Sequence, residues 1–362
     1  MKITSFNVTD VGYHYIGLRV IGAMPASDRE EQTQTISRSV LKFARDRAIR
    51  LMLPEPKSNY ETIGERVCQE LVHFQFADAT RNKGYVLTEA GGQALSLLEQ
   101  KRYLELRRVM TSVHLSTYSN LFAVVRSHIS CGEILSPVIE SGRTLDVRYL
   151  TSLLTPTFNG TADGVAESVY EESKGRSAKT IEDTLREKIL EKLVPGIKLG
   201  VPLFRAMCDR LISLRLLNIT KVTNEFGEFS KGYSPCTEGT DNRRWHNPLE
   251  ATVPNFGNYV IYLSEPNMDD RETRESFLEA VNTAFRILKS QAGYYDLPDV
   301  RDLVCETLMI PEAAFDEGIN ALLDTGRPPV TLGLTYDRIS GRRKPLVRAR
   351  ETTQIFNLIT RS

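Results

Sequence analysis

The chain has 362 residues, with 46 Lys or Arg against 46 Asp or Glu, so its formal net charge is zero. This length suits two to four compact units, and 41% hydrophobic with 25% charged residues is a globular balance that excludes a largely disordered chain. The neutral total also excludes a protein that coats nucleic acid over its whole surface, while it leaves room for local basic patches.

The cysteine pattern and the hydropathy indicate a cytoplasmic protein. The five cysteines are scattered and never form a CxxC pair, which predicts reduced, buried thiols without a disulfide framework or a zinc finger; they are Cys68, Cys131, Cys208, Cys236 and Cys305. The first fifteen residues lack the apolar stretch of a signal peptide. No apolar run is long enough to cross a bilayer, so no membrane is expected as a partner.

Residues 1–36 are predicted to form an N-terminal arm, because residues 13–20 alternate in the manner of a short strand. A helix with one apolar stripe and a basic remainder follows over residues 37–53, where two prolines stop it. A second helix is expected over residues 60–74. Two short strands then flank the turn at residues 82–84, and Thr88 is placed to cap another helix.

The stretch Gly84-Tyr85-Val86-Leu87-Thr88-Glu89-Ala90-Gly91 resembles the wing and final helix of many bacterial winged-helix proteins. The resemblance covers Ser37 to Leu98 and implies a winged helix there. Helical periodicity continues from residue 95 to about residue 130, so the first unit is predicted to be a winged helix with a long helical extension, residues 37–155. A loop of turn-forming composition at residues 155–164 marks its end.

The same order of elements recurs twice more. A second winged-helix-like unit is predicted over residues 177–235, with helices at 180–193 and 202–216 and strands at 217–223 and 229–234. Residues 236–268 are predicted to be a connector with one short strand. The C-terminal winged-helix-like unit, residues 269–362, has helices at 274–289, 297–308 and 311–323, then strands at 330–336 and 346–350 around a turn. The predicted fold class is therefore mainly α with short β-ribbons (α+β), arranged as tandem winged-helix domains.

Basic residues on the helix before each ribbon, and on the ribbon itself, are the candidate DNA contacts, since these parts of a winged helix meet the groove and the backbone. In the second unit the candidates are Arg205, Arg210, Arg215 and Lys221. In the C-terminal unit the helix is acidic, so only the ribbon qualifies, with Arg338, Arg342, Arg343, Lys344 and Arg348. In the first unit the wing carries Arg81 and Lys83, and the basic face of residues 37–53 adds to them. The alternative for each group is ordinary solvated surface charge.

Motifs for catalysis are lacking. The sequence contains no HExxH, no GxxxxGK[ST], no GxGxxG and no GxSxG pattern. Glu172 and Lys174, with Asp163 upstream, have the residue types of a nuclease element, but they lie in a polar stretch rather than a buried strand. No enzyme activity, cofactor, metal or small-molecule ligand is therefore expected. Trp245, beside Arg243 and Arg244, is either a base-stacking residue or a buried anchor of its loop.

The leading hypothesis is a non-enzymatic protein that binds double-stranded DNA through basic ribbons, as a component of a larger bacterial regulatory or phage-defence complex. The basic ribbons favour it. The alternative is a winged-helix scaffold or adaptor without direct DNA contact, which the neutral total charge and the acidic C-terminal helix favour. In either case a protein partner or self-association is expected.

Overall fold

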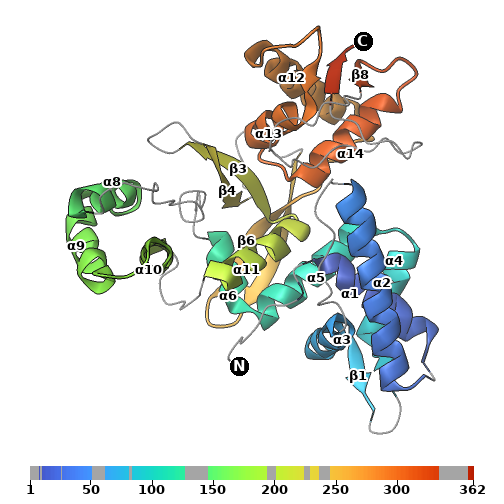
Figure 1. The fold of residues 1–362 in the computed structure, drawn as a ribbon. Helices are drawn as coiled ribbons and strands as arrows, with labels where there is room; N and C mark the ends of the chain where they lie inside the picture. The colour runs from blue at the N-terminus through green and yellow to red at the C-terminus, as the bar shows by residue number, and fades with distance from the viewer. Residues whose placement is uncertain are drawn as a thin grey trace.

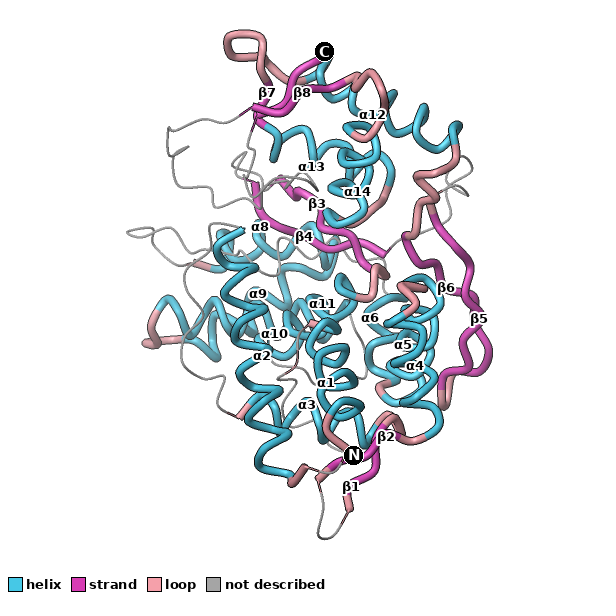
Figure 2. The backbone as a smooth tube through the Cα atoms, turned by 90° about the vertical axis from the view of Figure 1, so that its right-hand side faces the viewer, coloured by secondary structure: helices cyan, strands magenta, loops and turns pink. Residues whose placement is uncertain are grey.

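The computed structural model describes residues 8, 10–25, 27–50, 62–80, 84–126, 146–193, 201–223, 229–235, 245–333 and 358–362. These residues form a mostly helical fold with a few short antiparallel strand pairs, which confirms the α+β class (Figures 1 and 2). No helix in this part of the chain has the length and apolarity that crossing a membrane requires.

The first elements are α1 (Val11–Ala23), α2 (Arg29–Arg50) and α3 (Ile63–His73), followed by β1 (Ala77–Ala79), β2 (Tyr85–Leu87) and α4 (Glu89–Glu99). The predicted strand at residues 13–20 is wrong, because these residues lie in α1. Asp10 caps this helix by accepting a hydrogen bond from the Gly12 amide at 2.7 Å. The buried positions include Val11, His14, Leu18 and Ile21, which recur at helical spacing. The predicted alternation instead set Tyr13, Tyr15, Gly17 and Arg19 against the residues between them.

The Gly84–Gly91 stretch forms β2 and the start of α4 as predicted, with the Thr88 hydroxyl accepting from the Gly91 amide. Its two end glycines are required by close approach. A Cβ on Gly84 would lie 2.2 Å from Oε1 of the buried Gln32, and one on Gly91 would lie 1.9 Å from the Phe76 carbonyl oxygen. Gln32 on α2 in turn exchanges hydrogen bonds with the Tyr85 backbone, at 2.6 and 2.9 Å. This contact attaches α2 to the strand pair.

The adjacent glycines Gly91 and Gly92 provide a direct test of this packing. Gly91→Ala is expected to destabilise the protein by about 1–3 kcal/mol, because the added methyl group must displace backbone. Gly92→Ala meets nothing within 4 Å, so it should stabilise α4 by about 0.5–1 kcal/mol. Thermal unfolding followed by far-ultraviolet circular dichroism measures both. Equal effects of the two substitutions would contradict the close contact at Phe76.

The chain continues through α5 (Tyr103–Thr117), α6 (Ser119–Arg126), α8 (Val147–Phe158), a 3₁₀ turn (Asn159–Thr161) and α9 (Ala162–Ser173). The next helix, α10 (Ala178–Leu193), is the one predicted over residues 180–193. The predicted loop at residues 155–164 is therefore wrong. Asp146 caps α8, and the chain reverses in the single 3₁₀ turn, where Asn159 has a positive φ of 47°. One tight turn between two helices has the same turn-forming composition as a longer loop.

Residues 201–235 follow the prediction, with α11 (Val201–Ser213) leading into the paired strands β3 (Leu217–Thr223) and β4 (Phe229–Pro235). The predicted connector, by contrast, contains a regular hairpin of β5 (His246–Val253) and β6 (Gly257–Ser264). Its inner face buries Ala251, Val253, Ile261 and Leu263 in a hydrophobic core that also includes residues of α1 and α11. The hairpin therefore belongs to the main body of the fold.

The C-terminal unit contains α12 (Arg271–Ile287), β7 (Tyr295–Asp296), α13 (Leu297–Leu308), α14 (Glu312–Leu323), β8 (Val330–Gly333) and β9 (Leu358–Arg361), with the sheet order β7-β9-β8. Its separate core surrounds Phe277 and Phe315 and includes Trp245. The predicted strand at residues 346–350 and its turn lie outside the described residues. Figures 1 and 2 both show this unit at one end of the molecule, with β3 and β4 between its helices and α11.

Candidate nucleic-acid interface and buried ion pairs

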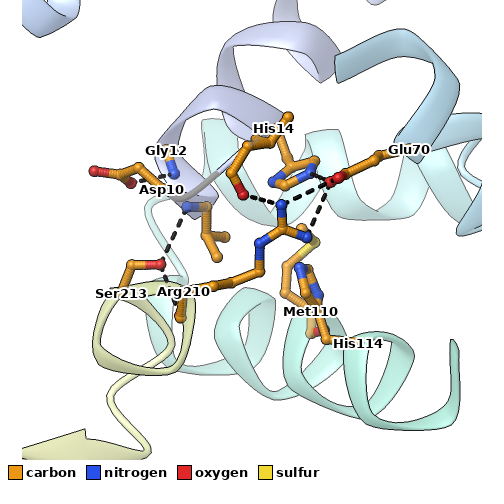
Figure 3. A network of polar contacts seen from close by, with 10 residues as sticks. Asp10, Gly12, His14, Glu70, Met110, His114, Arg210 and Ser213 are labelled. Atoms are coloured by element: carbon orange, nitrogen blue, oxygen red, sulfur yellow. Dashed lines mark hydrogen bonds and ion pairs between the residues drawn. The ribbon is translucent and has the colours of Figure 1, made fainter. Parts of the chain in front are cut away.

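Arg210 on α11 is fully buried, although the sequence places it among the DNA contacts. Its guanidinium pairs with Glu70 on α3, at 3.1 Å from Nη2 to Oε1 and 3.0 Å from Nη1 to Oε2, and it donates a hydrogen bond to the Val8 carbonyl oxygen (Figure 3). Glu70 therefore joins two helices that are far apart in the sequence. Arg210 follows the buried Met207 by three residues, so it lies on the inward side of the helix.

Two histidines complete this buried cluster. His14 on α1 contacts Glu70 at 2.6 Å through Nε2, and His114 on α5 donates from Nδ1 to the Met110 carbonyl oxygen at 2.6 Å. Their rings meet edge to face, with centroids 5.5 Å apart. Nδ1 of His14 and Nε2 of His114 are buried without a hydrogen-bond partner. Each ring is thus held as a neutral imidazole with one nitrogen unsatisfied.

The electrostatics of the cluster follow from this enclosure. Burial lowers the pKa of His14, against the opposing effect of Glu70, and burial together with Arg210 and His14 lowers the pKa of His114 well below its usual value. Burial by itself would raise the pKa of Glu70, but the hydrogen bonds and charges of His14 and Arg210 outweigh burial and lower it. The neutral-pH state is therefore one carboxylate, one guanidinium and two neutral rings.

Arg215, another predicted DNA contact, takes part in a second network. It follows α11 in the left-handed conformation, with φ of 61°. Its guanidinium makes two hydrogen bonds to Glu317 on α14, one of them 2.9 Å between Nη1 and Oε2, and it lies 3.6 Å from Glu265 after β6. Arg107 on α5 also pairs with Glu265. Burial, with the nearby charge of Arg215, lowers the pKa of Arg107 to about 10.

The structure thus gives Arg210 and Arg215 internal roles rather than the surface role expected from the sequence. The physical reason is that each guanidinium has carboxylate partners from distant parts of the chain, which charge counting along one helix does not detect. Arg205 and Lys221 lie in α11 and β3, but their side chains are not described. The ribbon candidates Arg81, Lys83, Arg338, Arg342, Arg343, Lys344 and Arg348 lie outside the described residues.

The basic face of α2, in contrast, is on the surface. Arg38, Lys42 and Arg45 are exposed and spaced by four and three residues, so they lie on one side of the helix over about 10 Å. Within the described part of the chain no carboxylate forms an ion pair with any of the three, and Arg38 donates only to the uncharged Gln34 amide. Figures 1 and 2 both show α2 along the outside of the fold. This exposed row of cations is suited to contact a polyanion.

The helix before the C-terminal ribbon, α14, is acidic as the sequence indicates. Asp316 on this helix lies 3.8 Å from the buried Arg301 of α13, and burial raises the pKa of Asp316 to about 7. Glu317, one position further, is the partner of Arg215. Asp316 and Glu317 of α14 therefore both interact with arginines of the same chain.

Trp245 is 1% exposed and packs against Phe277, with ring centroids 6.1 Å apart. It anchors its loop in the C-terminal core, so the base-stacking interpretation is wrong. Cys68, Cys208 and Cys305 are buried as predicted, while Cys131 and Cys236 lie outside the described residues. Among the residues with assigned positions, no group of three or more His, Cys, Asp or Glu side chains could hold a metal ion.

Comparison of the chain with protein-family models, with curated proteins and with solved structures gives no match.

Proposed function

We propose that the chain is a non-enzymatic DNA-binding subunit of winged-helix type, which holds the phosphate backbone and belongs to a larger bacterial regulatory or phage-defence complex. The observation that carries the proposal is the exposed row of Arg38, Lys42 and Arg45 on α2, without carboxylate partners in the described part of the chain. Cations arranged in this way bind phosphates independently of base sequence.

The layout of the units supports the winged-helix part of the proposal. In the C-terminal unit a short strand follows the first helix, two helices come next, and two further strands complete a sheet in the order β7-β9-β8. The first unit has three helices before the β1–β2 pair, and α11 precedes the β3–β4 pair in the second. A helix followed by a two-stranded ribbon is the arrangement expected of each winged helix.

Backbone binding is favoured over base recognition because of the charges on the helices that precede the ribbons. Arg210 and Arg215 are engaged internally, and α14 carries carboxylates that phosphates would repel. The basic ribbons around Arg81 and Arg342 are candidate phosphate contacts because of their sequence. Together with α2 they would supply backbone contacts at both ends of the chain.

A salt series with a labelled random duplex tests the proposal. Replacing Arg38, Lys42 and Arg45 with Ala should weaken binding for every sequence and reduce the slope of log K against log salt by about 2.7, the value for three phosphate contacts. The control replaces Arg271, Arg286 and Lys289, three exposed cations around α12, and removes the same net charge. Equal slopes for the two triple variants would contradict the role of α2.

The alternative function is a protein-binding scaffold or adaptor. This function is favoured by the ion pairs that Arg210 of α11 and Glu317 of α14 form within the chain. Side chains engaged in such pairs are not available to read DNA bases. Absence of binding by the wild-type protein at low salt would reject the DNA proposal. Co-purification of the intact chain with its complex would then test the scaffold function.

A further inference from the structure

The network around Arg215 joins the C-terminal unit to the rest of the fold. Arg215 and Arg107 come from the main body, Glu265 follows β6, and Glu317 lies on α14. The side chain of Arg215 is 7% exposed, while that of its partner Glu317 is 47% exposed. The carboxylate is thus the outer member of the pair, and it covers a guanidinium that is otherwise enclosed.

The charges in this network balance only when the C-terminal unit is in place. Two guanidiniums share two carboxylates, and the loss of Glu317 would leave Arg215 and Arg107 with Glu265 alone. An excess positive charge in a poorly hydrated site requires an anion. A phosphate offers the same pair of acceptor oxygens to the guanidinium fork as the Glu317 carboxylate does.

We infer that the Glu317 carboxylate occupies the position of a DNA phosphate: the C-terminal unit closes over Arg215, and Arg215 becomes a further backbone contact for DNA when this unit moves away. The inference rests on the proposed function and adds its regulation. In the closed state α14 and a phosphate compete for the same guanidinium, so DNA and closure oppose each other.

The boundary between the two parts is consistent with such movement. The hydrophobic core of the C-terminal unit, to which α14 contributes Phe315 and Ile319, and that of the main body are separate clusters, so the C-terminal unit can move as a whole without opening either one. Polar contacts across the boundary include the hydrogen bond at 2.9 Å between His246 Nε2 and the Met309 carbonyl oxygen. Because α13 also packs against β3, the Arg215–Glu317 pair shifts the balance between closed and open states and is not the whole interface.

Hydrogen exchange of the intact protein without DNA tests the closure. Glu317→Gln should increase exchange of the amides in α14 and of the Met309 and Ile310 amides by about tenfold. Glu312→Gln is the matched control, because it removes the same charge from the same helix five residues earlier. Unchanged exchange in Glu317→Gln, or an equal increase in Glu312→Gln, would overturn the inference.

The salt series with random duplex DNA tests the phosphate contact. Glu317→Gln should steepen the slope of log K against log salt by about 0.9 beyond the control, and the double variant with Arg215→Gln should lose this increment. Faster exchange without the steeper slope would reject the phosphate contact and leave only a closing ion pair. If the wild-type protein binds DNA and neither readout changes, the proposed function stands and this inference fails. If neither the wild type nor Glu317→Gln binds DNA, the proposed function and the phosphate contact both fail, and exchange alone decides the closure.

Discussion

Replacing Arg210 with methionine is expected to destabilise the protein by about 3–5 kcal/mol, the usual effect of removing one partner of a buried ion pair. Stability is lost because the partners of Arg210 stay buried after the guanidinium is removed. The Glu70 carboxylate, 14% exposed, would keep only His14 as a partner, and the Val8 carbonyl oxygen would lose its donor. Urea unfolding followed by far-ultraviolet circular dichroism measures the change. The single tryptophan lies in the C-terminal core and reports on that unit instead.

An exposed ion pair that also involves α3, the helix of Glu70, provides the control. Arg29 pairs with Glu65 of α3 at 2.9 Å, but both side chains are at least half exposed. Arg29→Met should therefore cost less than about 1 kcal/mol. Combining Arg210→Met with Glu70→Leu should recover much of the loss, because no unpaired carboxylate is then buried. Similar losses for Arg210→Met and Arg29→Met would show that burial of the Glu70 pair contributes little.

Sequence periodicity located several helices of this chain, because their apolar stripes reflect burial directly. The start of α2 was predicted at residue 37, but this helix begins at Arg29, within the predicted N-terminal arm. The helix containing Leu211, the helix containing Phe315 and the strand pair after Phe76 all form where the patterns place them. The errors occur where one residue type has two structural uses. Tyrosines that alternate in sequence belong to a helix, and turn-forming residues around Asn159 make one tight reversal between helices.

The buried polar networks could not be predicted in the same way. Arg210 has the spacing of an inward residue on α11, and this was the one available signal, but a buried arginine requires a carboxylate. That carboxylate, Glu70, is 140 positions away, and nothing local identifies it as the partner. The same is true of Arg215 and Glu317, which are 102 positions apart. A single sequence shows charges along each element, whereas the fold decides which of them meet.

The two buried histidines should reduce the stability of the folded protein as the pH falls below 6.5. Because the pKa values of His14 and His114 are lowered in the folded protein, the unfolded chain takes up protons near pH 6.5 while the folded protein resists them. The contribution of these two histidines to the stability is therefore fully present above pH 6.5 and decreases as the pH falls. Each histidine contributes about 1.4 kcal/mol per pH unit until its folded pKa is reached, or about 2.7 for both.

Glu70 acts in the same direction but at lower pH, because its folded pKa is lowered from a usual value of 4.5. The range between pH 6.5 and 4.5 therefore separates the histidines from Glu70. Asp316, whose folded pKa is raised to about 7, acts in the opposite direction in this range, and its contribution cancels when each histidine variant is compared with the wild type. His14→Gln can still donate to Glu70, and His114→Gln can still donate to the Met110 carbonyl oxygen, yet neither glutamine titrates. Urea unfolding at several pH values should show a shallower slope for each variant, while His73→Gln, which removes an exposed imidazole, should match the wild type. A slope that both glutamine variants leave unchanged would place the acid sensitivity elsewhere in the chain. If the pH dependence of the free energy of unfolding becomes shallower in both variants, the neutral rings of His14 and His114 stabilise the contact between α1, α3, α5 and α11.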